Sequence, residues 1–156
     1  MSVFLIQTNG RDIGSAKAEY TAVAKGSRMV DEPLKHHQYI NATPHWKETG
    51  YGRQDAWHRA SEGDTALLYC DSTVDEHGAC LSHIFPIENK VIDSEKALLE
   101  LGTPIEIVPK ISYQEIHDLV NRGEFSKDMR YCGQQGFNFT QVADSDLDRV
   151  RELTSD

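Results

Sequence analysis

The sequence predicts an α+β domain, built as a small mixed barrel or strongly bent sheet with peripheral helices. Short apolar runs bounded by turn residues recur along the chain, and segments with helical spacing are inserted between them. The regular βαβ alternation of a parallel α/β fold does not appear. A chain of 156 residues is long enough for one domain, 1–156, whose core needs neither disulfides nor a metal.

In the first half of the chain, apolar strands and turn residues alternate around two helical segments. Thr8, Asn9 and Gly10 end the first apolar run, as expected where a buried strand meets a turn. The expected elements are, in order, a strand from Val3 to Gln7, a helix from Ser15 to Lys25, a short strand near Tyr39, a short helix capped by Asp55, a Gly63-Asp64 turn and the strand from Thr65 to Cys70.

The second half begins with an acidic connection from Asp71 to Gly78. Ser112 to Glu115 is a capping box, which predicts a helix start. Pro104 and Pro109 place their strand at a sheet edge, because proline cannot donate to a ladder. The other expected elements are a strand from Ala79 to Val91 bent at Pro86, a helix from Ser94 to Leu101, an edge strand from Thr103 to Ile111, and strand pieces from Arg130 to Cys132 and Phe137 to Val142 around a loop at 133–136. Asp144 is expected to cap a last helix, which would pack against the rest of the domain through Leu147, Val150 and Leu153.

Charge and composition narrow the function classes. The net charge of −9 disfavours charge-driven nucleic-acid binding but leaves room for a local basic face. The three cysteines lack a CxxC pair, so reduced thiols are expected. The chain has no apolar run of membrane-spanning length and no signal-peptide pattern, which predicts no membrane partner and a cytoplasmic location.

Sequence patterns for cofactor or metal chemistry are absent. The seven histidines lack the paired spacings of zinc sites, so we expect no metal. Neither a G-x-S-x-G elbow nor a P-loop or Rossmann fingerprint occurs, and the GQQG at 133–136 does not match a phosphate loop. We therefore expect no cofactor and assign no catalytic residue.

The stretch from Trp46 to Asp71 has an unusual density of aromatic residues for a chain with 8% aromatics. Flat rings next to loop glycines are typical of a pocket wall on which a planar base can stack. Trp46 is the best candidate, because it belongs to no apolar period. Trp57 and Tyr69 are equally well explained as core residues, and Phe137 is a later candidate.

Polar residues near these rings have two interpretations as well. Thr8 and Asn9 could read the edge of a ligand by hydrogen bonds, or simply form a turn. A modest basic rim of Lys47, Arg53 and Arg130 is equally an ordinary solvated surface, and for Arg59 the solvated surface is the better interpretation.

The order of these motifs resembles the EVE domain, a member of the PUA-like superfamily that also includes YTH and ASCH domains. The resemblance rests on a first strand ending in Thr-Asn (VFLIQTN), Trp46 ahead of a Gly-Asp turn, the strand LLYC, and the stretch MRYCGQQGFNFTQV before a final helix. It implies a PUA-like pseudo-barrel whose pocket binds a modified nucleotide. By position, Trp46 would be a cage wall, Thr8 and Asn9 the floor, with Tyr69 and Phe137 nearby. The segment from Arg11 to Pro44 departs from the pattern as a long insertion.

The resulting hypothesis is a non-catalytic module that recognises a modified, methylated base in DNA or RNA, working alone or beside a separately encoded nuclease or other effector. An ASCH-like enzyme acting on RNA or a modified nucleoside is the alternative, with Lys47, Tyr51, Arg53 and Asp55 as its candidate groups. A third possibility is a small regulatory protein-partner domain whose aromatic residues are all core.

Overall fold

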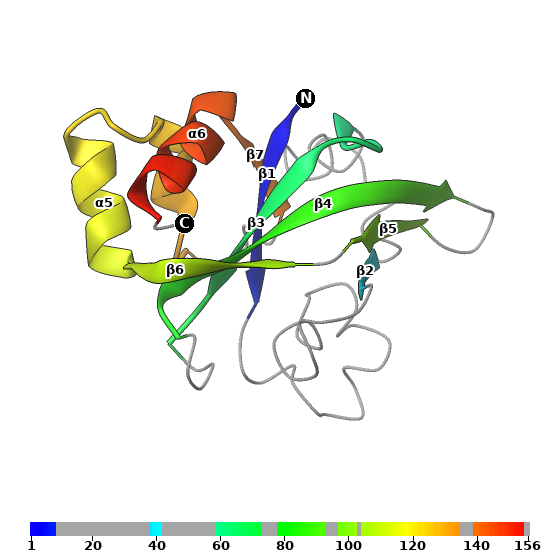
Figure 1. Cartoon of the computed structure of the whole chain (residues 1–156), viewed down its shortest axis with the longest axis horizontal. Helices are drawn as coiled ribbons and strands as arrows, with labels where there is room; N and C mark the ends of the chain where they lie inside the picture. The colour runs from blue at the N-terminus through cyan, green and yellow to red at the C-terminus, as the bar shows by residue number, and fades with distance from the viewer. Residues whose placement is uncertain are drawn as a thin grey trace.

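The computed structural model describes residues 1–8, 38–41, 59–72, 78–92, 97–102, 104–134 and 139–154. These ranges contain a seven-stranded mixed sheet, two α-helices and a 3-10 helix (Figure 1). The elements are β1 (Val3–Thr8), β2 (Gln38–Asn41), β3 (Thr65–Cys70), β4 (Cys80–Ile92), β5 (Ala97–Leu101), β6 (Ile105–Ser112), α5 (Tyr113–Asn121), the 3-10 helix η2 (Lys127–Tyr131), β7 (Phe139–Val142) and α6 (Asp144–Leu153).

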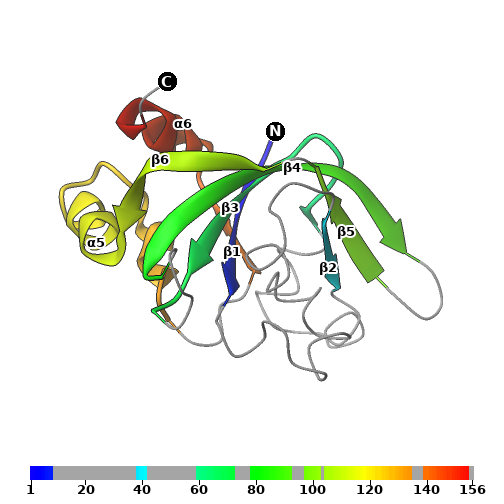
Figure 2. The same ribbon diagram turned by 60° about the horizontal axis from the view of Figure 1, so that its bottom comes forward.

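The long strand β4 holds the sheet together. Its first part pairs antiparallel with β3 and β6, and its second part pairs with β5, which pairs in turn with β2. Register shifts interrupt these ladders, and such irregularities bend a strand. Figure 2 shows the resulting curve of β4 across the molecule. The order β2-β5-β4-β3-β1-β7, with β6 on β4, is an open path of described strands.

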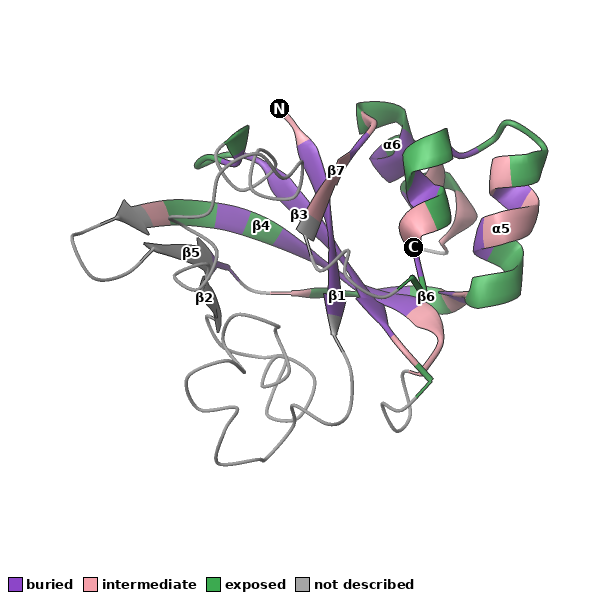
Figure 3. Cartoon of the chain, turned by 180° about the vertical axis from the view of Figure 1, so that it is seen from behind, coloured by how far each residue is buried: buried purple, intermediate pink, exposed green. Residues whose placement is uncertain are grey.

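Both faces of the central strands are buried. On one face, side chains of β1 and β3 pack against α5, η2 and α6 in a single apolar cluster, and Figure 3 shows buried strand segments beside these helices. On the other face, Phe4, Ile6 and Leu68 are at most 1% exposed. All six residues of β3 are buried. Burial on both faces explains why these strands are continuous apolar runs instead of alternating ones.

Polar side chains define where the described helices begin. The capping box is confirmed, since the Glu115 amide donates to Ser112 Oγ over 3.2 Å. At α6 the expected cap was wrong, because Ala143 holds the cap position and Asp144 is the first helical residue. Asp146 does the capping instead. Its carboxylate accepts from the amides of Ala143 and Ser126 and from Ser126 Oγ, at 2.6–2.9 Å.

Two further sequence predictions were wrong. The helix expected from Ser94 to Leu101 is replaced by β5, which lies between β2 and β4 and gains ladder hydrogen bonds from both neighbours. The strand piece expected from Arg130 to Cys132 falls largely in η2, where Met129 is fully buried, and Cys132, the residue that follows η2, is fully buried as well. In both cases tertiary partners outweighed local propensity.

The remaining strand predictions are confirmed within one to three residues, including the short strand near Tyr39 and the edge strand β6, which contains Pro109 and begins just after Pro104. The Gly63-Asp64 turn is also confirmed, with Gly63 at φ +94°. The expected helices from Ser15 to Lys25 and after Asp55 lie outside the described residues, apart from a helical Arg59. No helix in the described ranges is long and apolar enough to span a membrane.

Candidate nucleic-acid interface

The first strand and the LLYC strand end side by side. β1 and β3 are parallel, with Gln7 opposite Tyr69 and Thr8 opposite Cys70. Because both strands run in the same direction, their carboxyl ends open at the same edge of the sheet. The structure therefore brings the backbone of Thr8 next to the end of the strand that carries Tyr69, which are two positions of the predicted pocket.

Gln7 ties a later turn of the chain to this edge. Its side-chain Nε2 donates to the Tyr131 carbonyl, and its Oε1 accepts from the Gly133 amide, each over 2.9 Å. The side chain is 9% exposed and so lies in a region where unmade hydrogen bonds are expensive. The amide thus fixes the turn at 131–133 from its inner side. We call Gln7 and this turn the Gln7 clamp.

Residues of α5 brace the same turn from another direction. His117 Nε2 lies 3.2 Å from the Cys132 carbonyl, and the rings of Tyr113 and His117 are 4.3 Å apart. Gly133 has φ +87°, and a Cβ there would meet the Tyr113 ring at 2.7 Å. Only glycine satisfies both requirements, so Gly133 lets this turn pack closely against the Tyr113 ring.

Tyr69 lies beneath this turn as part of the helix-side core. It is 2% exposed, and burial, reinforced by nearby Cys132 and Cys80, raises its pKa. The phenol is therefore fully protonated at neutral pH and is a hydrogen-bond donor. Of the two interpretations of Tyr69, the structure gives the core one, with the ring backing the turn at 131–133.

A chain of polar side chains occupies the opposite face of the sheet near the same edge. The Cys70 sulfur lies 3.4 Å from Ser82 Oγ, and His83 Nδ1 lies 2.8 Å from the same hydroxyl. All three residues are at most 4% exposed. Burial raises the pKa of Cys70 to about 11, so its thiol is protonated and a poor nucleophile at neutral pH.

Arg130 is the one predicted rim residue that the structure describes. It is exposed, its guanidinium carbon lies 4.9 Å from the centre of the Tyr131 ring, and its Nη2 donates to the Tyr131 hydroxyl over 3.0 Å. Apart from Thr8 and Tyr69, placed above, the other predicted site residues lie outside the described ranges, as do the candidate groups of the enzyme alternative. The site residues outside are Asn9, Trp46, Lys47, Arg53, Trp57 and Phe137.

Comparison with known proteins identifies the fold. No protein-family model matches the chain, and no curated protein matches its sequence. Human THYN1, solved in complex with DNA containing 5-methylcytosine, matches with a TM-score of 0.63 at 12% identity, over 98% of this chain and 97% of that chain. Rpa0253 from Rhodopseudomonas palustris matches with a TM-score of 0.59 at 9% identity, over 97% and 92%. A Pseudomonas putida protein matches with a TM-score of 0.58 at 10% identity, over 97% and 98%.

The chain has a PUA-like fold. Identities this low establish the architecture alone, and the α+β prediction is confirmed.

Within this PUA-like fold, the thiols in the described part of the chain are held in their protonated form. Burial raises the pKa values of all three thiols, Cys70, Cys80 and Cys132. No group of three or more metal-ligating side chains occurs in the described ranges. What the arrangement offers is a rigid strand edge, backbone groups at Thr8, and an exposed arginine stacked on a tyrosine.

Sequence reasoning missed the residues that build this edge. Gln7 appeared only as the end of the first strand, and Ser82 and His83 only as part of a later one. The available signal was a polar residue inside an otherwise apolar strand, since such a group must find a partner when buried.

Proposed function

We propose that this chain is a non-catalytic binding module of EVE type that recognises a modified, methylated base in DNA or RNA. Trp46 forms the pocket wall, Thr8 and Asn9 its polar floor, and Trp57 and Phe137 further ring surface, with Tyr69 packed behind the turn. Lys47, Arg53 and Arg130 provide the rim. The output is passed to an effector such as a separately encoded nuclease.

The observation that carries this proposal is the likeness to human THYN1 over nearly the whole of both chains, because that protein was solved with 5-methylcytosine DNA. A shared fold by itself leaves function open. The second support is local: the carboxyl ends of β1 and β3 lie together, and the Gln7 clamp holds the turn next to them.

The energetics suit a binding module. Extruding a base costs a few kcal/mol, which stacking at roughly 1–3 kcal/mol per ring and a few edge hydrogen bonds offset. Burying one methyl group contributes of order 1 kcal/mol, so the discrimination expected from the methyl alone is about tenfold. The raised pKa values of the thiols also favour a binder over a thiol-dependent enzyme.

The test uses intrinsic Trp fluorescence, because the chain has only two Trp residues. The protein is titrated with short oligonucleotides that carry 5-methylcytosine or N6-methyladenosine, as DNA and RNA, and with their unmodified versions. We expect quenching by one modified base that is lost in Trp46→Phe. Trp57→Phe leaves Trp46 as the single Trp and so shows how much of the quenching comes from Trp46.

A flat response to every oligonucleotide would contradict the proposal. Turnover of RNA or of a modified nucleoside by metal-free protein, abolished by changing Lys47 or Asp55, would instead establish the enzyme.

A further inference from the structure

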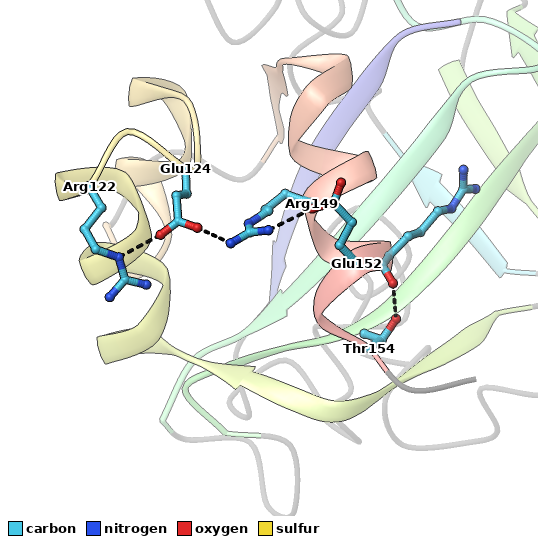
Figure 4. A network of polar contacts seen from close by, with 6 residues as sticks. Arg122, Glu124, Arg149, Glu152 and Thr154 are labelled. Atoms are coloured by element: carbon cyan, nitrogen blue, oxygen red, sulfur yellow. Dashed lines mark hydrogen bonds and ion pairs between the residues drawn. The ribbon is translucent and has the colours of Figure 1, made fainter.

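Two arginines on the helical layer, Arg122 and Arg149, are neutralised by carboxylates. Arg122 Nε lies 2.7 Å from Glu124 Oε2, and Arg149 Nη1 lies 2.7 Å from Glu152 Oε2 (Figure 4). Arg149 also pairs with the second oxygen of Glu124, so that one carboxylate joins the end of α5 to α6. These arginines lower the pKa of Glu124 through hydrogen bonds and charge. The positive charges of Arg122 and Arg149 are therefore neutralised by ion pairs within the protein.

Two other arginines are held by uncharged partners. Arg59 Nε donates to Gln141 Oε1 over 2.5 Å, and Arg130 Nη2 donates to the Tyr131 hydroxyl over 3.0 Å. Both residues are exposed, and neither makes an ion pair within the described ranges. A neutral partner orients a guanidinium without cancelling its charge. In a chain of net charge −9, this arrangement reserves two oriented cations for an external anion.

Both arginines border the edge strand β7. Gln141, the partner of Arg59, belongs to β7, and η2, which carries Arg130, packs against the same strand. β7 pairs with β1, and the Gln7 clamp fixes the turn next to Arg130 to the end of β1. Gln141 lies opposite Phe4, near the start of β1, so Arg59 is held at the amino ends of β1 and β3, whereas Arg130 lies near their carboxyl ends, where the candidate interface is. The two cations therefore flank β7 at opposite ends. We call Arg59 and Arg130 the β7 arginines.

We propose that the β7 arginines bind backbone phosphates at two separate places along the nucleic acid whose base occupies the proposed pocket, an inference that rests on the proposed function. A guanidinium has five N–H donors in a fork that matches phosphate oxygens. Arg130 uses one N–H of Nη2 on Tyr131, and among the described residues the N–H groups of Nε and Nη1 and the second N–H of Nη2 remain for a ligand. Its stacking on the Tyr131 ring holds the side chain in place, so less rotamer freedom is lost on binding.

We predict that replacing the β7 arginines weakens the salt dependence of oligonucleotide affinity. A merely structural role of these residues would not produce this change. Affinity is measured by fluorescence anisotropy against the same modified oligonucleotides, labelled with fluorescein, between low and moderate salt. Each lost phosphate contact reduces the slope of log K against log salt concentration by about 0.9 on duplex DNA, or about 0.7 on a single strand. We expect this reduction for Arg59→Gln and Arg130→Gln, and about twice as much for the double variant.

Arg151→Gln is the matched control. Arg151 is an exposed arginine on α6 whose side chain joins none of the ion pairs described above, so the variant removes the same charge from another part of the surface. We expect its slope to equal that of the unchanged protein, and all of these variants to keep the melting temperature.

The outcomes separate the two proposals. If the unchanged protein binds no oligonucleotide, the proposed function fails. If it binds and the β7 variants keep its slope, or change it no more than Arg151→Gln does, the function stands and the phosphate contacts are wrong. Binding of polyglutamate with the same dependence on the β7 arginines, in place of oligonucleotides, would assign these residues to an acidic protein partner and overturn the inference.

Discussion

Replacing Gln7 with methionine tests whether the Gln7 clamp holds the candidate interface together. Methionine has nearly the same length and fits an apolar strand, so the substitution removes the amide while conserving volume. It leaves the Tyr131 carbonyl and the Gly133 amide without their partner at a position that is 9% exposed.

Each partly buried group left unpaired costs about 1–3 kcal/mol. Because the two hydrogen bonds are only partly buried, the lower half of that range applies, and we expect a loss of about 2–4 kcal/mol in the free energy of unfolding. For a chain of this size, a loss of about 3 kcal/mol lowers the melting temperature by roughly 6–12 °C.

The assay is urea denaturation followed by circular dichroism, with thermal melting as a second measurement. The midpoint is expected to fall while the slope m stays constant, since the surface exposed on unfolding does not change. Gln114→Met is the matched control. Gln114 is exposed on α5 and bonds only a side chain, that of Asp118, so its substitution should stay within about 0.5 kcal/mol. If Gln7→Met lowers the free energy of unfolding no more than the control does, the stabilising role of the Gln7 clamp is refuted.

Two further predictions follow from glycine geometry and thiol burial. Gly133→Ala should cost about 1–3 kcal/mol, because alanine at φ +87° is strained and its Cβ would meet the Tyr113 ring. Gly123→Ala, at φ +78° with no neighbour within 4 Å, is its control, and equal losses in denaturant midpoints would mean that the Tyr113 contact is irrelevant. The second prediction concerns alkaline pH. The folded-state pKa of Cys70 is raised from 9.0 to about 11, so the stability that its protonated form contributes is complete below pH 9 and is lost as pH rises toward 11. The loss is at most about 2.7 kcal/mol. A Cys70→Ala variant should lose less stability over this window, and parallel curves for the two proteins would disprove the linkage.

Strand runs, turns and one helix start were predictable from local sequence. Val3–Thr8 and Thr65–Cys70 are apolar runs between turn residues. A strand that is buried on both faces needs apolar residues at nearly every position, so such a run indicates a buried strand. Ser112 and Glu115 form a cap through their own side chains, which needs no distant partner. The wrong helix assignment over Ser94 to Leu101 has a tertiary cause. Ala97–Leu101 is rich in leucine and suits a helix alone, but β2 and β4 supply ladder partners on both sides of it.

The candidate site was predictable only in outline. The sequence predicted that the end of the first strand and the LLYC strand contribute to one site, and the parallel pairing of β1 with β3 brings them together. It gave no role to Gln7, whose two partners lie 124 and 126 residues further along the chain. Hydrogen bonds over such separations leave no local sequence pattern, because neither residue by itself indicates which distant residue will be its partner.

The sequence by itself determined the α+β class, most strand positions, the capping box and the acidic charge, since these depend on local periodicity, turn chemistry and composition. Only the tertiary structure decided which polar groups are used inside the protein and which remain for a partner. Arg122, Arg130 and Arg149 are alike in the sequence, yet Glu124 neutralises the first and last, while Tyr131 orients Arg130 and leaves its charge intact. The physical reason is that a side chain's available charge depends on its neighbours in space, which the packing of η2 against β7 and α5 sets.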